Sequence, residues 1–267
     1  MNLDWITHEP EDVYHSRSKS GEFMSSHLLA DFRSSPLLFH KKILGLVSEP
    51  PSTAFAFGTA AHKLILEGQV AFDEAYTVSD GPVNEKTGLP YGKTTKAYAE
   101  WYASQTKEII STEDYGKIAE FRASVLRNEL ATQLLKIGQP EGVARVKLND
   151  VPCQIRMDWF NPEMGLVDLK TTAELRYFES DARRFGYVFQ MAFYRSVIFA
   201  LTGITVPVHI IAVEKCEPYA AGVWMLAPSA LDDAECVNHA ALNRFKNCVV
   251  ENVWPSGYET VRIIDTL

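Results

Sequence analysis

Residues 151–172 read VPCQIRMDWFNPEMGLVDLKTT, and this order of residue types predicts two strands joined by a tight turn. Apolar, aromatic and β-branched side chains are frequent in residues 151–160 and 166–170, as in strands. Residues 161–165 contain a proline and a glycine, which favour a turn between the strands. A further alternating segment over residues 142–148 precedes them after a short polar turn. The region therefore predicts an antiparallel meander of three strands.

Two aspartates and a lysine are prominent polar residues of this hairpin. Asp168 and Lys170 lie two residues apart, so they share one face of a strand, while the residues beside them point into a core. Asp158 lies near the end of the preceding strand, and strand pairing can bring it within a few ångströms of Asp168. Two carboxylates that close repel each other unless a cation lies between them, and Mg²⁺ prefers such ligands. A surface ion pair between Lys170 and a neighbouring aspartate is the alternative interpretation.

The rest of the chain shows helical patterns and two further apolar runs. Helices are expected over residues 26–35, 36–44, 53–67, 95–110, 113–136, 179–202 and 229–250, and strands over residues 206–213 and 222–226. Ser25 or Ser26 can cap the first helix, and Pro36 favours the start of the second. The order of these elements predicts an α/β fold with a mixed central β-sheet flanked by helices.

The whole chain, residues 1–267, reads as one domain. It is 46% hydrophobic and 22% charged, as is typical of a soluble globular protein. Residues 1–20 are polar and predict a flexible or capping segment, and residues 78–96 carry the glycines and prolines of a mobile loop. No apolar run has membrane-spanning length, and the N-terminus lacks the pattern of a signal peptide. A cytoplasmic protein without a membrane partner is therefore expected.

Charge and cysteine content argue against some classes of site. The formal net charge is -8, which disfavours a surface coated in positive charge. It still allows DNA binding in a local basic groove beside a carboxylate metal site. The four cysteines show no CxxC spacing, which argues against a zinc ribbon or a four-cysteine iron–sulfur cluster.

Asp158 followed by Asp168-Leu169-Lys170 resembles the core motif of the PD-(D/E)XK nuclease superfamily. The similarity is to its RecB-like members and, in particular, to the RecE-type recombination exonucleases of phages and prophages. In that superfamily a first acid precedes a hairpin and a second acid is followed by x-Lys. The resemblance implies a PD-(D/E)XK nuclease core in which Lys170 assists the attacking water or offsets charge in the transition state.

Two more motifs fit the same resemblance. Gly58, His62 and Glu67 resemble the Gly-x-x-x-His-x-x-x-x-Glu helix of these nucleases, in which the histidine is a metal ligand. A histidine buried in an apolar core is the alternative. Gln190 and Tyr194 are one helical turn apart and resemble the Gln-x-x-x-Tyr motif that follows the catalytic lysine. Gln190 can then bind the phosphate, the water or Lys170, or it is simply exposed beside a core tyrosine.

The resemblance also implies a set of metal ligands, and local basic groups suggest most of the DNA contacts. Mg²⁺, for which Mn²⁺ would substitute, is expected on His62, Asp158, Asp168 and the Leu169 carbonyl. Glu141 is a possible extra ligand, and an exposed glutamate without a function is the alternative for it. Asp158, Asp168, Lys170 and Gln190 are the expected catalytic residues. The expected DNA contacts are Ser25, Ser26, Arg33, Lys93, Lys96, Arg156, Arg183, Arg184 and Tyr194. Helix capping is the alternative for the two serines, and a solvated helix surface is the alternative for Arg183 and Arg184.

The implied activity is ATP-independent digestion of double-stranded DNA ends, from 5′ to 3′, leaving a 3′ single strand. Absence of a Walker motif and of iron–sulfur cysteines favours a stand-alone enzyme. The family implies a homo-oligomeric ring, trimer or tetramer, and a single-strand annealing protein as partner. A structure-specific or repair endonuclease on the same fold is one alternative. A non-catalytic DNA-binding module is another.

Overall fold

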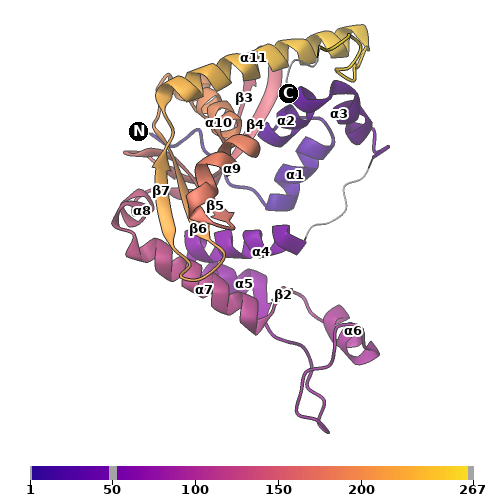
Figure 1. The fold of residues 1–267 in the computed structure, drawn as a ribbon, viewed down its shortest axis with the longest axis vertical. Coiled ribbons are helices and arrows are strands. Elements are labelled where there is room, and N and C mark those ends of the chain that lie inside the picture. The colour runs from indigo at the N-terminus through magenta and orange to yellow at the C-terminus, as the bar shows by residue number, and fades with distance from the viewer. Residues whose placement is uncertain (1, 48–52, 264–267) are drawn as a thin grey trace.

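A mixed five-stranded sheet lies at the centre of the computed structural model, which describes residues 2–47 and 53–263 (Figure 1). Its strands lie side by side in the order β3-β4-β5-β6-β7. Their bounds are Gln139–Leu148, Val151–Asn161, Gly165–Thr172, Val208–Glu214 and Ala221–Met225. β3, β4 and β5 form the expected antiparallel meander, whereas β5 and β6 are parallel. A parallel pair needs a long crossover, and helices supply it here.

The crossover is not the single helix predicted over residues 179–202. It consists of a 3-10 turn (Leu175–Tyr177), α9 (Phe178–Arg184) and α10 (Tyr187–Thr202). Gly186 separates the two helices with a left-handed backbone at φ 71°, a conformation that glycine adopts without a side-chain clash. The predicted continuous helix is therefore wrong at this glycine.

Helices cover both faces of the sheet. On one face, α10, α11 (Pro228–Glu251) and α2 (Ser26–Ser34) enclose a core, which α3 (Pro36–Ile43) extends. On the other face lie α7 (Thr112–Arg127), α8 (Glu129–Leu134), α4 (Thr53–His62) and a five-residue π turn, Lys63–Glu67. Alternation along β5 sends Leu166 to the first core and Val167 and Leu169 to the second.

Two other predicted helices need correction. The helix expected over residues 113–136 is interrupted at Asn128, whose extended backbone ends α7 and whose side chain accepts a bond from Ala131 N to cap α8. The helix expected over residues 95–110 ends early: α6 spans Lys96–Ala103, and β2 (Glu108–Ile110) then pairs with β1 (Tyr76–Val78). α5 (Gly68–Ala75) precedes β1. Residues 79–103, which include most of the predicted loop and α6, project from the body (Figure 1).

The N-terminal segment packs against the meander. Its helix α1 spans Glu11–Lys19, and a β-bridge joins Thr7 to Val143 on β3. The buried Gln154 on β4 donates from Nε2 to the Tyr14 carbonyl at 2.9 Å and to the Ser18 hydroxyl at 2.7 Å. These contacts place α1 beside the first hairpin. Within the described residues, none of the helices combines the length and apolarity needed to span a bilayer.

Candidate active site

Three acidic side chains lie in a row across neighbouring strands. Glu141 on β3 is the register partner of Asp158 on β4, because the β3–β4 pairs on either side of them share one register. On its other side, β4 stays paired with β5 up to Trp159↔Val167. Extending that register by one position would put Asp158 opposite Asp168, although the β4–β5 pairing itself ends at Trp159↔Val167. Residues opposite each other on antiparallel strands place their side chains on the same face, so Glu141 and Asp158 lie together, and Asp168 is near enough for the Asp158 charge to raise its pKa.

The sheet opens around Asp158. Glu141 has a left-handed backbone at φ 54°, which is uncommon for a non-glycine residue and interrupts regular pairing with β4. β5 also separates from β4 after Val167. The amide of Leu169 then donates to Oδ2 of Asp158 at 2.8 Å, which satisfies an N–H group that a strand partner would otherwise use. The predicted motif therefore lies where the sheet splits.

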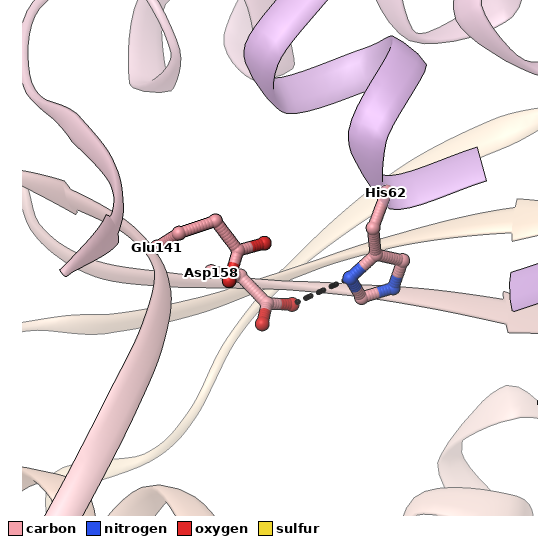
Figure 2. Close-up of side chains that lie close together, drawn as sticks. All are labelled: His62, Glu141 and Asp158. Carbon is pink, nitrogen blue, oxygen red and sulfur yellow. Dashed lines mark ion pairs between the residues drawn. The ribbon is translucent and has the colours of Figure 1, made fainter. Parts of the chain in front are cut away.

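His62 reaches this opening from the end of α4, directly before the π turn. Its Nδ1 lies 3.4 Å from Oδ2 of Asp158 (Figure 2). Among the described residues, His62, Glu141 and Asp158 form a group whose potential ligand atoms all lie within 4.8 Å of one another. Burial lowers the pKa of His62, although the Asp158 charge opposes this shift. A neutral imidazole is the form that ligates metals.

Asp168 and Lys170 form a buried ion pair beside that group. Lys170 Nζ lies 2.7 Å from Oδ2 of Asp168. Burial alone would lower the pKa of Lys170, but the charges of Asp168 and Asp158 outweigh it and raise the pKa, so the ammonium form is favoured. Burial raises the pKa of Asp168 against the attraction of Lys170. Apart from the contact of Oδ2 with Lys170, the carboxylate oxygens of Asp168 have no hydrogen-bond partner among the described residues.

These donors fit a divalent cation. Oδ1 of the buried Asp168 has no hydrogen-bond partner among the described residues, and such an oxygen is costly unless a cation compensates it. Carboxylates and one imidazole match the ligand preferences of Mg²⁺ and Mn²⁺. Asp168 is not a member of the group formed by His62, Glu141 and Asp158, so the structure gives Glu141 a more central position than the sequence suggested. The backbone of Leu169, whose carbonyl was expected as a further ligand, is hydrogen-bonded to His62.

A family model described as "PDDEXK-like domain of unknown function (DUF3799)" matches residues 25–266. The chain belongs to this family. A crystal structure from Eubacterium rectale, named "Putative exonuclease", shares the fold of this PDDEXK-like domain with a TM-score of 0.69 and 18% sequence identity. The similarity covers 98% of this chain and 96% of that one. No curated protein matches the sequence.

The pocket of this PDDEXK-like domain extends past the acidic row to Arg156. Arg156 lies on β4, with its Nε 2.7 Å from Glu141 and its Nη1 3.6 Å from Glu11 on α1. Burial, and next the Asp158 charge, raise the pKa of Glu141 despite Arg156. Hydrogen bonding to His15 lowers the pKa of Glu11, and Arg156 adds to that effect. Arg156 is thus held by two carboxylates, one of them a candidate metal ligand.

Gln190 and Tyr194 line the same pocket from α10. The Gln190 amide lies 3.5 Å from the Tyr194 hydroxyl. Burial raises the pKa of Tyr194, and the hydroxyl also bonds to Ser26. Tyr194 therefore stays neutral, and Gln190 presents its amide to the pocket that contains Asp158 and Lys170.

Other expected DNA contacts have internal partners or lie elsewhere. Ser25 is buried and caps α2 by accepting from Leu28 N, as the alternative interpretation held. The Arg33 guanidinium bonds to Asn238 and stacks 4.1 Å above the Phe189 ring, so the α2–α11 packing occupies it. Lys93 and Lys96 lie at or near the start of α6 in the projecting segment, and Lys96 pairs with Glu100 at 3.6 Å. Arg183 and Arg184 are exposed at the end of α9.

Several pocket residues were not anticipated from the sequence. They are Glu11, Tyr14, His15, His27 and Lys63, whereas Glu67 was expected from its motif. Lys63 and Glu67 pair at 2.8 Å next to His62, so their proximity to a candidate ligand was an available signal. The α1 residues offered none, because they reach the site only through packing on β3 and β4, and the matched family region begins after them.

Glu141→Gln is expected to raise the Mg²⁺ concentration for half-maximal cleavage by about tenfold, because changes near a metal typically weaken affinity 10- to 100-fold. Saturating Mg²⁺ should restore most of the rate, since Asp158 and Asp168 remain. The measurement is the initial rate of DNA cleavage against Mg²⁺ concentration. Glu163→Gln, on the exposed turn between β4 and β5, is the matched control. An unchanged Mg²⁺ dependence in Glu141→Gln would remove Glu141 from the ligand set.

Proposed function

We propose that this nuclease is a Mg²⁺-dependent, ATP-independent exodeoxyribonuclease that digests linear double-stranded DNA. The observation that carries the proposal is one pocket in which His62, Glu141 and Asp158 converge beside the Asp168–Lys170 pair. Such a group suits hydrolysis of a phosphodiester better than a structural role, because it concentrates buried carboxylates that repel one another. The exonuclease name of the structural neighbour supports the choice of activity.

His62, Glu141, Asp158 and Asp168 would hold the cation. When bound there, Mg²⁺ supplies Lewis-acid polarisation of the phosphate and acidification of water. Lys170 keeps its proton in this environment, so its ammonium group can orient the attacking water and offset charge that develops on the phosphate. Gln190 can position the same phosphate or water by hydrogen bonding.

The DNA backbone would lie along local cations rather than a uniformly basic surface. Arg156 is inside the pocket, and Arg183 and Arg184 are exposed at the end of α9. Lys93 and Lys96 would contact the duplex farther away, on the projecting segment. Phosphate contacts release counterions, so binding through these groups should weaken steeply with salt.

The finer assignment follows the RecE-type resemblance. It proposes digestion from the 5′ end and release of a 3′ single strand to an annealing protein. It also proposes a homo-oligomeric ring, either trimer or tetramer, around the duplex. These points rest on the resemblance and not on the geometry of the pocket, because a fold alone does not set the direction of cleavage.

Digestion of end-labelled linear duplex tests the activity, the metal requirement and the direction together. We expect release of 5′-labelled nucleotides with Mg²⁺, none with EDTA, and persistence of a covalently closed circle of the same sequence. Mn²⁺ in place of Mg²⁺ should sustain the reaction. Cutting of the closed circle would instead identify an endonuclease, and equal digestion in EDTA would exclude the metal-dependent chemistry.

A further inference from the structure

A line of side chains leads from the Asp168–Lys170 pair to the surface. Lys170 Nζ lies 5.0 Å from the centroid of the Tyr187 ring, at the first turn of α10. The Tyr187 ring is stacked on Phe185, with centroids 5.9 Å apart and an interplanar angle of 30°. The Arg184 guanidinium lies 5.4 Å from the centroid of the Phe185 ring. Lysine, two aromatic rings and arginine thus follow one another outward from the pocket.

Phe185 has no evident structural reason for its position. It is 58% exposed although it is a large apolar side chain. Phe185 is the C-cap residue that follows α9, and the left-handed Gly186 after it is the N-cap of α10, so the ring lies at the corner between the two helices. Tyr187, by contrast, also packs against Phe178, with centroids 6.2 Å apart, and so is fixed from below. A rigid tyrosine therefore supports an exposed phenylalanine.

The surroundings of the ring match nucleic acid rather than protein. Arg183 and Arg184 precede it and are exposed, and the Arg184 guanidinium lies over the ring itself. Exposed aromatic faces beside guanidinium groups are the combination that binds unpaired bases together with their phosphates. A base in a duplex cannot offer its face, because its neighbours in the stack cover it.

We propose that Phe185 and Tyr187 form a stacking platform for an unpaired base of the strand being cut, with Arg184 on an adjacent phosphate. This inference rests on the proposed nuclease function and deepens it: the preferred substrate is a melted or single-stranded segment at the pocket, not an intact stack. The aromatic face would hold the separated base while the backbone stays beside Lys170.

The test measures binding of a short oligothymidylate to the full chain in EDTA by fluorescence anisotropy. Phe185→Ala should weaken binding about tenfold, since stacking of one base on an aromatic ring is worth that much or more. Phe185→Leu should be as weak as the alanine variant because it is apolar but has no ring face. Phe185→Trp should restore wild-type affinity or exceed it.

Phe199→Ala is the matched control. Phe199 is also exposed, at 52%, on α10, and twelve residues of helix put it about 18 Å from Tyr187. It should bind the oligonucleotide like the wild type. Wild-type affinity in Phe185→Ala or Phe185→Leu would overturn the platform, and so would an equal loss in Phe199→Ala or no oligonucleotide binding by the wild type.

Because these measurements contain no metal, they are separate from the proposed hydrolysis. A wild-type chain that binds the oligonucleotide through Phe185 but never degrades linear duplex with Mg²⁺ would retain the platform and reject the nuclease function. If the wild-type chain degrades duplex but Phe185→Ala binds the oligonucleotide normally, the nuclease function is retained and the platform is rejected.

Discussion

Asp158→Asn is expected to reduce DNA cleavage by about 10³-fold or more. Loss of one carboxylate from the ligand group removes several kcal/mol of charge stabilisation, and each 1.36 kcal/mol changes the rate tenfold. The fold should survive, because asparagine keeps the oxygen that accepts from Leu169 N and removes repulsion with Glu141 and Asp168. Single-turnover cleavage of linear duplex measures the effect, and duplex affinity in EDTA should stay near that of the wild type.

Asp150→Asn provides the control for this substitution. Asp150 lies in the β3–β4 turn with a left-handed backbone at φ 65°, which asparagine tolerates, and its side chain is exposed and paired with Lys246. Cleavage by this variant should equal that of the wild type. An Asp158→Asn protein that kept a tenth of the wild-type rate would rule out Asp158 as a ligand required for hydrolysis.

Lys170→Met should lower the cleavage rate by about 10²- to 10³-fold, the loss typical when one preorganised stabilising group is removed. Methionine fills similar space, but it gives neither the attacking water nor the phosphate a positive group. Lys170→Arg should not rescue the rate, because the planar guanidinium cannot replace a compact ammonium between Asp168 and the Tyr187 ring. Rates are to be measured at saturating DNA and Mg²⁺, with circular dichroism to verify folding.

Lys147→Met tests for a general effect of removing a strand lysine. Lys147 is exposed on β3, away from the pocket, and its replacement should leave cleavage unchanged. If Lys170→Met retained a third of the wild-type rate at saturating Mg²⁺, the lysine would be a structural partner of Asp168 and not a participant in the reaction.

The meander was predictable because its determinants are local. Strand periodicity over residues 151–172, the turn at residues 161–165 and the two-residue spacing of Asp168 and Lys170 are enough to define the hairpin and its polar face. The same locality explains the success with α2, whose N-cap and following proline are both visible in the sequence.

Other features depend on contacts that sequence periodicity does not contain. Glu141 became central because its left-handed backbone and the β3–β4 register put it opposite Asp158, and register is a property of the folded pair. Glu11 approaches Arg156 from a helix 145 positions away in sequence, held there by Gln154. The helix breaks at Asn128 and Gly186 were overlooked because apolar periodicity continues through both.

Calorimetric titration with Mg²⁺ or Mn²⁺ measures whether the pocket at Asp158 binds the divalent cation on which hydrolysis depends. We predict saturable binding to the wild-type chain and to Asp150→Asn, and loss of that binding in Asp158→Asn. Equal metal affinity in Asp158→Asn and wild type, or no binding to the wild type at concentrations that support cleavage, would contradict this prediction.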